Sequence, residues 1–139
     1  MRAFEDIAAD FEFLDDWEDR YRYIIELGKE LEPLPEEARN EQNKVHGCVS
    51  QVWLLAEAGR NEAGQPTLLL KGDSDALIVR GLVSVLLSMV SGKPAAEIID
   101  MDMKAKLDSL GLQEHLTPQR ANGLMAMIER IREEARKVA

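Results

Sequence analysis

Apolar residues recur at helical spacing in the first part of the chain. Phe4, Ile7 and Phe11 fall on one face and predict an amphipathic helix over residues 3–14. Asp16 follows at a point where its carboxylate can accept backbone N–H bonds, which indicates the start of a second helix. Two prolines end that helix, and a polar turn or loop is expected after them.

The middle of the chain has the pattern of strands. Residues 52–57 and 67–71 are apolar runs separated by a polar segment that contains two glycines and a proline. This arrangement predicts an antiparallel hairpin with a long loop. A third, short strand is expected from the segment around Val45.

Residues 76–90 are apolar nearly all the way round a helix, which is typical of a helix surrounded by other elements. A membrane span is the alternative, but the run is shorter than the roughly 20 apolar residues that a span requires. It also contains Arg80. Ser74 or Asp75 is predicted to cap this helix. Gly81 inside it indicates that another backbone packs closely, with the sheet as the expected neighbour.

The last third of the chain predicts helices again. Two short helices are expected over residues 95–101 and 103–110, and Thr117 followed by Pro118 supplies the cap and first turn of a final helix. The charged face of that helix, which includes Arg130, is expected to be solvated. Helices that precede and follow a small sheet of about three strands along the chain predict one α+β domain over residues 1–139.

Composition narrows the functional classes. The hydrophobic share of 45% and the charged share of 31% are ordinary for a soluble globular protein. A net charge of −9 argues against binding nucleic acid or an anionic membrane surface, because phosphates would repel the chain. The N-terminal residues have no signal-peptide pattern, and the chain has one cysteine, so we expect a cytoplasmic protein.

The single cysteine, Cys48, is the leading candidate for chemistry. It cannot form an internal disulfide, so it is either a small buried hydrophobic residue or a nucleophile. Gly47 permits a bend at this point, and a wholly polar segment precedes it while a predicted strand follows. This position, between an irregular segment and a rigid element, favours a reactive thiol.

Other chemistry has weaker support. A Cys-His hydrolase would need His46 or His115 within hydrogen-bond reach of the sulfur, together with an oxyanion site, and no orienting motif surrounds either histidine. A zinc site that adds a carboxylate such as Asp73 to these residues matches no recognised ligand spacing. The segment at residues 72–75 lacks the lysine and the glycine spacing of a phosphate-binding loop.

Three motifs together carry a resemblance to a known family. Residues 43–53 read NKVHGCVSQVW, residues 72–82 read GDSDALIVRGL, and residues 115–120 read HLTPQR, with Gly123 and Leu124 after them. In this order they resemble the SufE family, the sulfur acceptors of iron–sulfur cluster assembly. The resemblance covers essentially the whole chain and implies a SufE/IscU-like fold.

The resemblance also implies a function. Cys48 would accept a sulfane sulfur from the persulfide of a SufS-like cysteine desulfurase, activate that enzyme, and pass the sulfur to a SufBCD-like scaffold. Pyridoxal phosphate (PLP) would belong to the desulfurase, so the chain itself needs no cofactor or metal. Relatives of the CsdE type leave another maturation pathway open. A regulatory module that stimulates the desulfurase by docking, without carrying sulfur, is the alternative function.

The family's motifs imply roles for further residues. His46 and Gly47 belong to the cysteine loop, although the family varies at His46 and at Val49. Asp73 and Asp75 match a motif that packs near this loop, and Arg120 matches a position that stabilises a thiolate or contacts the partner. For Asp75 helix capping is an equal alternative. The resemblance also implies that the resting cysteine faces an apolar pocket, lined by Val45, Val49 and the central helix.

Overall fold

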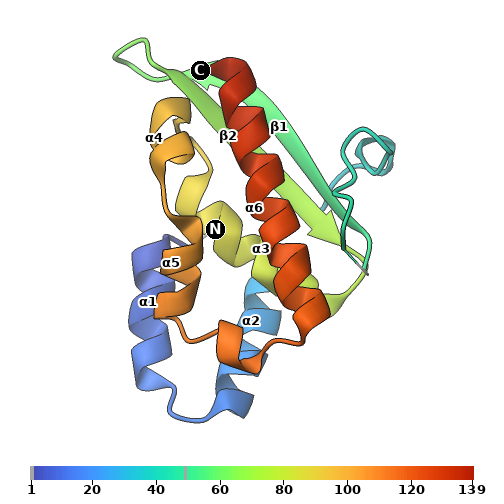
Figure 1. The fold of residues 1–139 in the computed structure, drawn as a ribbon, viewed down its shortest axis with the longest axis vertical. Coiled ribbons are helices and arrows are strands. Elements are labelled where there is room, and N and C mark those ends of the chain that lie inside the picture. The colour runs from blue at the N-terminus through green and yellow to red at the C-terminus, as the bar shows by residue number, and fades with distance from the viewer. Residues whose placement is uncertain (1, 49) are drawn as a thin grey trace.

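The computed structural model describes residues 2–48 and 50–139, with only the main chain of Gln113. The described elements, in chain order, are α1 (Phe4–Phe13), α2 (Trp17–Lys29), η1 (Glu36–Ala38), β1 (Val52–Arg60), β2 (Pro66–Ser74), α3 (Leu77–Val90), β3 (Lys93–Pro94), α4 (Ala95–Asp100), α5 (Met103–Ser109), η2 (Gln113–His115) and α6 (Pro118–Val138). Helices precede and follow a small sheet, which confirms the predicted α+β class (Figure 1).

The sheet is antiparallel and has the order β1-β2-β3 among the described residues. The first two strands form the predicted hairpin, in which Leu54 pairs with Gly72. Both strands are longer than expected. The third strand is Lys93–Pro94, so the prediction that the segment around Val45 supplies it was wrong. That segment instead makes an isolated bridge to the outer edge of β1, between Lys44 and Trp53.

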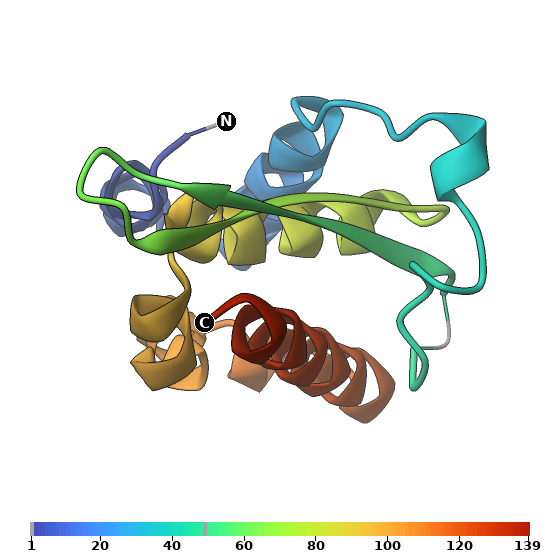
Figure 2. The same ribbon diagram turned by 90° about the horizontal axis from the view of Figure 1, so that it is seen from above.

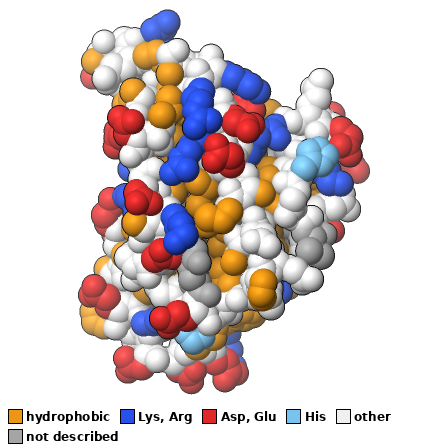
Figure 3. All heavy atoms as spheres, viewed as in Figure 1, with side chains coloured by type: hydrophobic (Ala, Val, Ile, Leu, Met, Phe, Trp, Pro, Cys, Tyr) orange, Lys and Arg blue, Asp and Glu red, His pale blue; other side chains and the backbone are white. Residues whose placement is uncertain are grey.

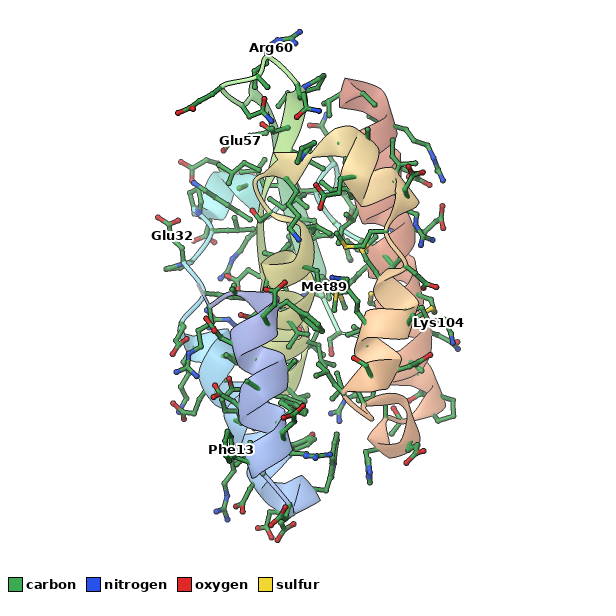
Figure 4. The ribbon with its side chains drawn as sticks, turned by 90° about the vertical axis from the view of Figure 1, so that its left-hand side faces the viewer. Phe13, Glu32, Glu57, Arg60, Met89 and Lys104 are labelled. Atoms are coloured by element: carbon green, nitrogen blue, oxygen red, sulfur yellow. The ribbon has the colours of Figure 1, made fainter. Side chains whose placement is uncertain are left out.

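Helices cover one face of the sheet. The helices α3 and α6 pack on β2, and α2 packs on α3. In Figure 2 the strands are seen edge-on with α6 on one side, and the segment between α2 and β1 passes round the end of the sheet toward that side. Met89 of α3 is fully buried inside, whereas Phe13 lies exposed at the end of α1 (Figure 4).

The crossing of α2 and α3 explains the glycine inside α3. A Cβ added at Gly81 would lie 2.1 Å from the carbonyl oxygen of Ile24, so only glycine fits there. The neighbouring backbone belongs to α2, and the prediction of the sheet as that neighbour was wrong. None of the described helices combines the length and the apolar run needed to span a membrane.

The caps agree with the sequence at two helices and differ at a third. Asp16 accepts from Glu18 N at the start of α2, and Thr117 accepts from Arg120 N at the start of α6. The N-cap of α3 is Ala76, which has no side-chain acceptor. The Ser74 hydroxyl accepts from the Ala76 N–H at 3.2 Å, so Ser74 orders the turn before the helix rather than capping it.

Candidate functional site

Cys48 lies in a short loop between two fixed points of the chain. The N–H of Val45 donates to Val52 O at 2.8 Å, so the chain returns to β1 just beyond the loop. Gly47 has a φ of +94°, a left-handed conformation that a side chain would strain. The predicted bend before the cysteine is therefore confirmed.

The sulfur of Cys48 borders a pocket of about 250 Å³. Val79 and Leu82 of α3 and Met127 of α6 supply its apolar walls. The other described residues that line it are Ser50, Thr117, Gln119, Arg120 and Gly123. The central helix does line the pocket, as expected, but Val45 does not, because it is buried in the core next to β1. Val49 is outside the described residues.

The thiol is held against α6. Cys48 Sγ donates a weak hydrogen bond to the carbonyl oxygen of Gly123 at 3.6 Å. Burial raises the pKa of the Cys48 thiol above its ordinary value, because a thiolate loses solvation in these surroundings. In this conformation the sulfur is therefore protonated at neutral pH and poorly nucleophilic. Attack by Cys48 needs the loop to move outward or a cation to come closer.

Arg120 is the basic residue that lines the pocket. Its backbone lies in the first turn of α6, where Thr117 caps the helix. Its Nη1 donates to the hydroxyl of Tyr21 at 2.9 Å, which fixes the guanidinium beside the pocket. The prediction that Arg120 lies near the cysteine loop agrees with this placement. An arginine held there can stabilise negative charge that develops on sulfur.

Asp75 fixes the downstream end of the cysteine loop. Its Oδ1 accepts from the Gln51 N–H at 3.0 Å, and its own N–H donates to Gln51 O at 3.2 Å. The Ser74 hydroxyl donates to the same carbonyl at 2.7 Å. Asp75 therefore bonds to the residue before β1 and does not cap α3, so the capping alternative is wrong and the role of Asp75 at the loop stays a prediction.

Asp73 is buried away from the pocket lining and is 1% exposed. Its Oδ2 lies 2.5 Å from Arg39 Nη2, and its Oδ1 lies 3.0 Å from Arg80 Nε. The Arg80 Nε–H is not aligned for a hydrogen bond, so that contact is an ion pair only. Arg39 also stacks on Trp53, with its Cζ 5.3 Å from the ring centroid. Asp73 thus ties the segment around η1 to β2 and α3.

The two histidines are separate from the sulfur's pocket. His46 is exposed, with Nε2 3.7 Å from a Glu41 carboxylate oxygen. His115 stacks on Trp17 with a centroid distance of 3.9 Å. Neither lines the pocket that Cys48 borders, so the geometry gives no support to a Cys-His hydrolase. Across residues 2–48 and 50–139, no cluster of three or more His, Cys, Asp and Glu side chains is placed to hold a metal.

Sequence reasoning missed the face of α6 that meets the loop. Gly123, Ala126, Met127 and Arg130 recur at helical spacing on this face, and Gly123 and Met127 are buried. A Cβ added at Gly47 would lie 3.3 Å from Ala126 Cβ, so the loop packs directly on the helix. A glycine inside a helix is a signal of such close approach.

Comparison with known proteins settles the family. A sequence model described as "SufE: Fe-S metabolism associated domain" matches residues 5–135. The chain belongs to the SufE family. It is 53% identical over 135 residues to an uncharacterized SufE-like protein of Rhizobium meliloti, covering 97% of this chain and 96% of the relative. A SufE-like protein of Rhizobium etli is also 53% identical, over 136 residues that cover 98% and 91% of the two chains.

A solved structure supports the fold. The solution structure of a hypothetical protein from Thermus thermophilus matches with a TM-score of 0.72 at 24% identity. The match covers 97% of this chain and 94% of that one. Membership of the SufE family associates the chain with iron–sulfur metabolism as a sulfur-transfer partner. The roles of its individual residues rest on the geometry above.

Proposed function

We propose that Cys48 carries sulfur as a persulfide between a PLP-dependent cysteine desulfurase and an acceptor in iron–sulfur cluster assembly. The observation that carries this proposal is the placement of the sulfur on a short loop beside a mostly apolar pocket of about 250 Å³. A lone thiol suits such a relay, because no second cysteine can discharge the persulfide as an internal disulfide.

The transfer is a thiol exchange. The Cys48 thiolate attacks the outer sulfur of the desulfurase persulfide, the S–S bond in that persulfide breaks, and the desulfurase cysteine leaves as a thiolate. Cys48 then holds the outer sulfur as its own persulfide. Sulfur atoms and electrons balance between the two proteins, so no further oxidant or reductant is needed.

The geometry suits two stages of this cycle. With the loop seated, the raised pKa of Cys48 keeps the thiol protonated and protects it from side reactions. With the loop displaced toward a partner, the thiol regains solvent and its ordinary acidity. Arg120 would stabilise the thiolate, or the persulfide once the loop is seated again, and its position in the lining of the same pocket supports this role.

The proposed partners follow from this chemistry. The donor is a SufS-like desulfurase, which holds the PLP, and the acceptor is a SufBCD-like scaffold. Docking would use the surface around the cysteine loop, with Asp75 and Gly47 setting the position of the loop. A cytoplasmic location agrees with a cysteine that must stay reduced.

The test is the intact mass of the protein after incubation with an active desulfurase and free cysteine, followed by alkylation and peptide mapping. The proposal expects one added sulfur on Cys48 that depends on the desulfurase. A Cys48→Ser variant should fold, carry no sulfur and fail to stimulate the desulfurase. If Cys48 gains no sulfur from an active desulfurase and Cys48→Ser still stimulates the enzyme fully, the chain is a docking module and the sulfur-carrier proposal is overturned.

A further inference from the structure

Arg130 of α6 reaches the chain just before the cysteine loop. Its Nη1 donates to Lys44 O at 3.0 Å and its Nη2 donates to Gln42 O at 2.5 Å. Its Nε donates to Glu134 Oε1 at 3.1 Å, which orients the guanidinium plane. The side chains of Arg130 and Glu134 are 20% and 18% exposed. The bonds to Lys44 O and to Glu134 are partly buried, whereas the bond to Gln42 O is exposed. Both acceptors on the loop side are main-chain carbonyls.

Arg130 lies on the face of α6 that receives the loop. It comes seven residues after Gly123, so the two positions lie on one side of the helix. Gly123 meets the Cys48 sulfur, and Ala126, between them, packs beside Gly47. Figure 3 shows basic and acidic side chains interleaved over α6. Arg130 donates to the carbonyl of Lys44, just before the cysteine loop, whereas Arg132 donates to the carbonyl of Met101.

We propose that Arg130 is a positioning residue for Cys48. It ties the upstream end of the cysteine loop to the same helix that accepts the sulfur, while Asp75 ties the downstream end. With both ends fixed, the sulfur stays seated on Gly123. Lys44 and Val45 stay bonded to β1, so release of the Arg130 contact allows His46, Gly47 and Cys48 to move away from α6, which exposes the thiol. The inference rests on the proposed function only for the reason why Cys48 is exposed, which is sulfur transfer with a partner.

The test measures the second-order rate of Cys48 alkylation by iodoacetamide in the folded protein. The variant is Arg130→Met, which keeps an unbranched side chain as far as the position of Nε and removes every donor. The matched control is Arg132→Met on the same helix, because Arg132 also donates to a carbonyl, that of Met101, which is remote from the loop. Both variants lose one positive charge. Circular dichroism and the thermal midpoint establish folding in each.

Alkylation of a seated thiol proceeds through transient opening, so its rate follows the open population. We expect Arg130→Met to react roughly fivefold to tenfold faster than the parent, the scale set by losing charge-assisted hydrogen bonds. Arg132→Met should react at the parent rate. Arg130→Lys keeps a cation with donors and should restore most of the slow rate.

The pH profile separates this mechanism from a simple charge effect. Loss of a cation near the thiol raises its pKa and slows alkylation at neutral pH. Loop opening does the reverse, because a solvated thiol ionises more readily. Arg130→Met should therefore show a lower pH midpoint than the parent as well as a faster rate. A stability loss without opening would move neither the midpoint nor the rate of the native protein.

A milder variant covers the case in which Arg130→Met does not fold. Glu134→Gln removes only the charge that orients Arg130, and we expect roughly a twofold faster alkylation. Parent-like rates and midpoints in the folded variants would overturn the proposal, as would an equal acceleration in Arg132→Met. The assay contains no desulfurase, so its outcome is independent of whether Cys48 carries sulfur.

Discussion

Cys48 Sγ lies 3.6 Å from the carbonyl oxygen of Gly123, and a Cβ added at Gly123 would lie 3.4 Å from the sulfur. The helix therefore has no side chain at the position where the thiol is seated. Gly123 also lines the pocket that Cys48 borders. A side chain at position 123 that extends beyond Cβ would enter the space that the sulfur occupies.

Gly123→Leu should fill this space and displace the sulfur. We expect Cys48 in this variant to be alkylated several-fold faster than in the parent, since the seated conformation is no longer available. Gly123→Ala is the control, because its Cβ makes only an ordinary contact and the seated thiol is kept. Iodoacetamide kinetics followed by mass spectrometry give the rates. Slow alkylation in Gly123→Leu would show that the sulfur does not need this seat.

Cys48 should also make stability depend on pH. Because burial raises the pKa of its thiol, the folded chain binds the thiol proton more tightly than the unfolded chain. The contribution of the thiol is then fully present below the ordinary cysteine pKa of about 8.5 and is lost as pH rises through the higher folded value. Urea unfolding of the parent and of Cys48→Ala, compared at neutral and alkaline pH, measures it.

The free energy of unfolding of the parent should fall relative to that of Cys48→Ala as the pH rises from neutral to alkaline. The control is Ser50→Ala, because Ser50 lines the same pocket but does not titrate. The difference in free energy of unfolding between Ser50→Ala and the parent should stay constant over the same pH range. A difference between Cys48→Ala and the parent that also stays constant would mean that the thiol is solvated in the folded state.

The sequence predicted the helices and the hairpin because their signals are local. Asp16 and Thr117 cap helices where expected, since a cap depends only on residues within one turn. The third strand was assigned to the wrong segment, because Lys93–Pro94 pairs with β2 across a whole helix. Such long-range pairing leaves no pattern in either segment alone.

The candidate site was predicted in part. Cys48 and Gly47 were found because a lone cysteine beside a glycine is unusual in itself. Arg130 was placed on a solvated face, since its contacts are main-chain carbonyls 86 and 88 residues away. Asp73 and Asp75 are two residues apart and differ in role. Asp73 forms an ion pair with Arg80, and Asp75 accepts a hydrogen bond from the Gln51 N–H.

The α2–α3 crossing gives a prediction on stability. Gly81→Ala would place its Cβ 2.1 Å from Ile24 O, so the helices must separate. We expect a loss of about 3 kcal/mol or more in the free energy of unfolding, the scale of overpacking in a core. Gly123→Ala is the matched control, because it makes the same change inside a helix without a clash. It should gain up to about 1 kcal/mol from helix propensity.

Urea unfolding of the two glycine variants and the parent tests this. Equal stabilities for Gly81→Ala and Gly123→Ala would mean that α2 and α3 are farther apart in solution than the structure has them. A loss confined to Gly81→Ala supports the contact between the two helix backbones.

Substitutions at Asp73 and Asp75 should have different effects on the stability of the domain and on the position of the cysteine loop. Asp73→Ala leaves Arg39 and Arg80 without their shared carboxylate, and we expect a loss of about 2–4 kcal/mol, below the full cost of breaking a buried pair because both arginines are partly exposed. Asp75→Ala removes an exposed acceptor and should cost about 1 kcal/mol.

The effects of the two substitutions on Cys48 alkylation should be in the opposite order. Asp75→Ala frees Gln51 N and should speed alkylation several-fold, whereas folded Asp73→Ala should alkylate near the parent rate, since Asp73 does not line the pocket. Urea unfolding and iodoacetamide kinetics on the same preparations measure both quantities. If the variant with the larger loss of stability is also the one that exposes Cys48, then the loop is held by the general stability of the domain and not by Asp75.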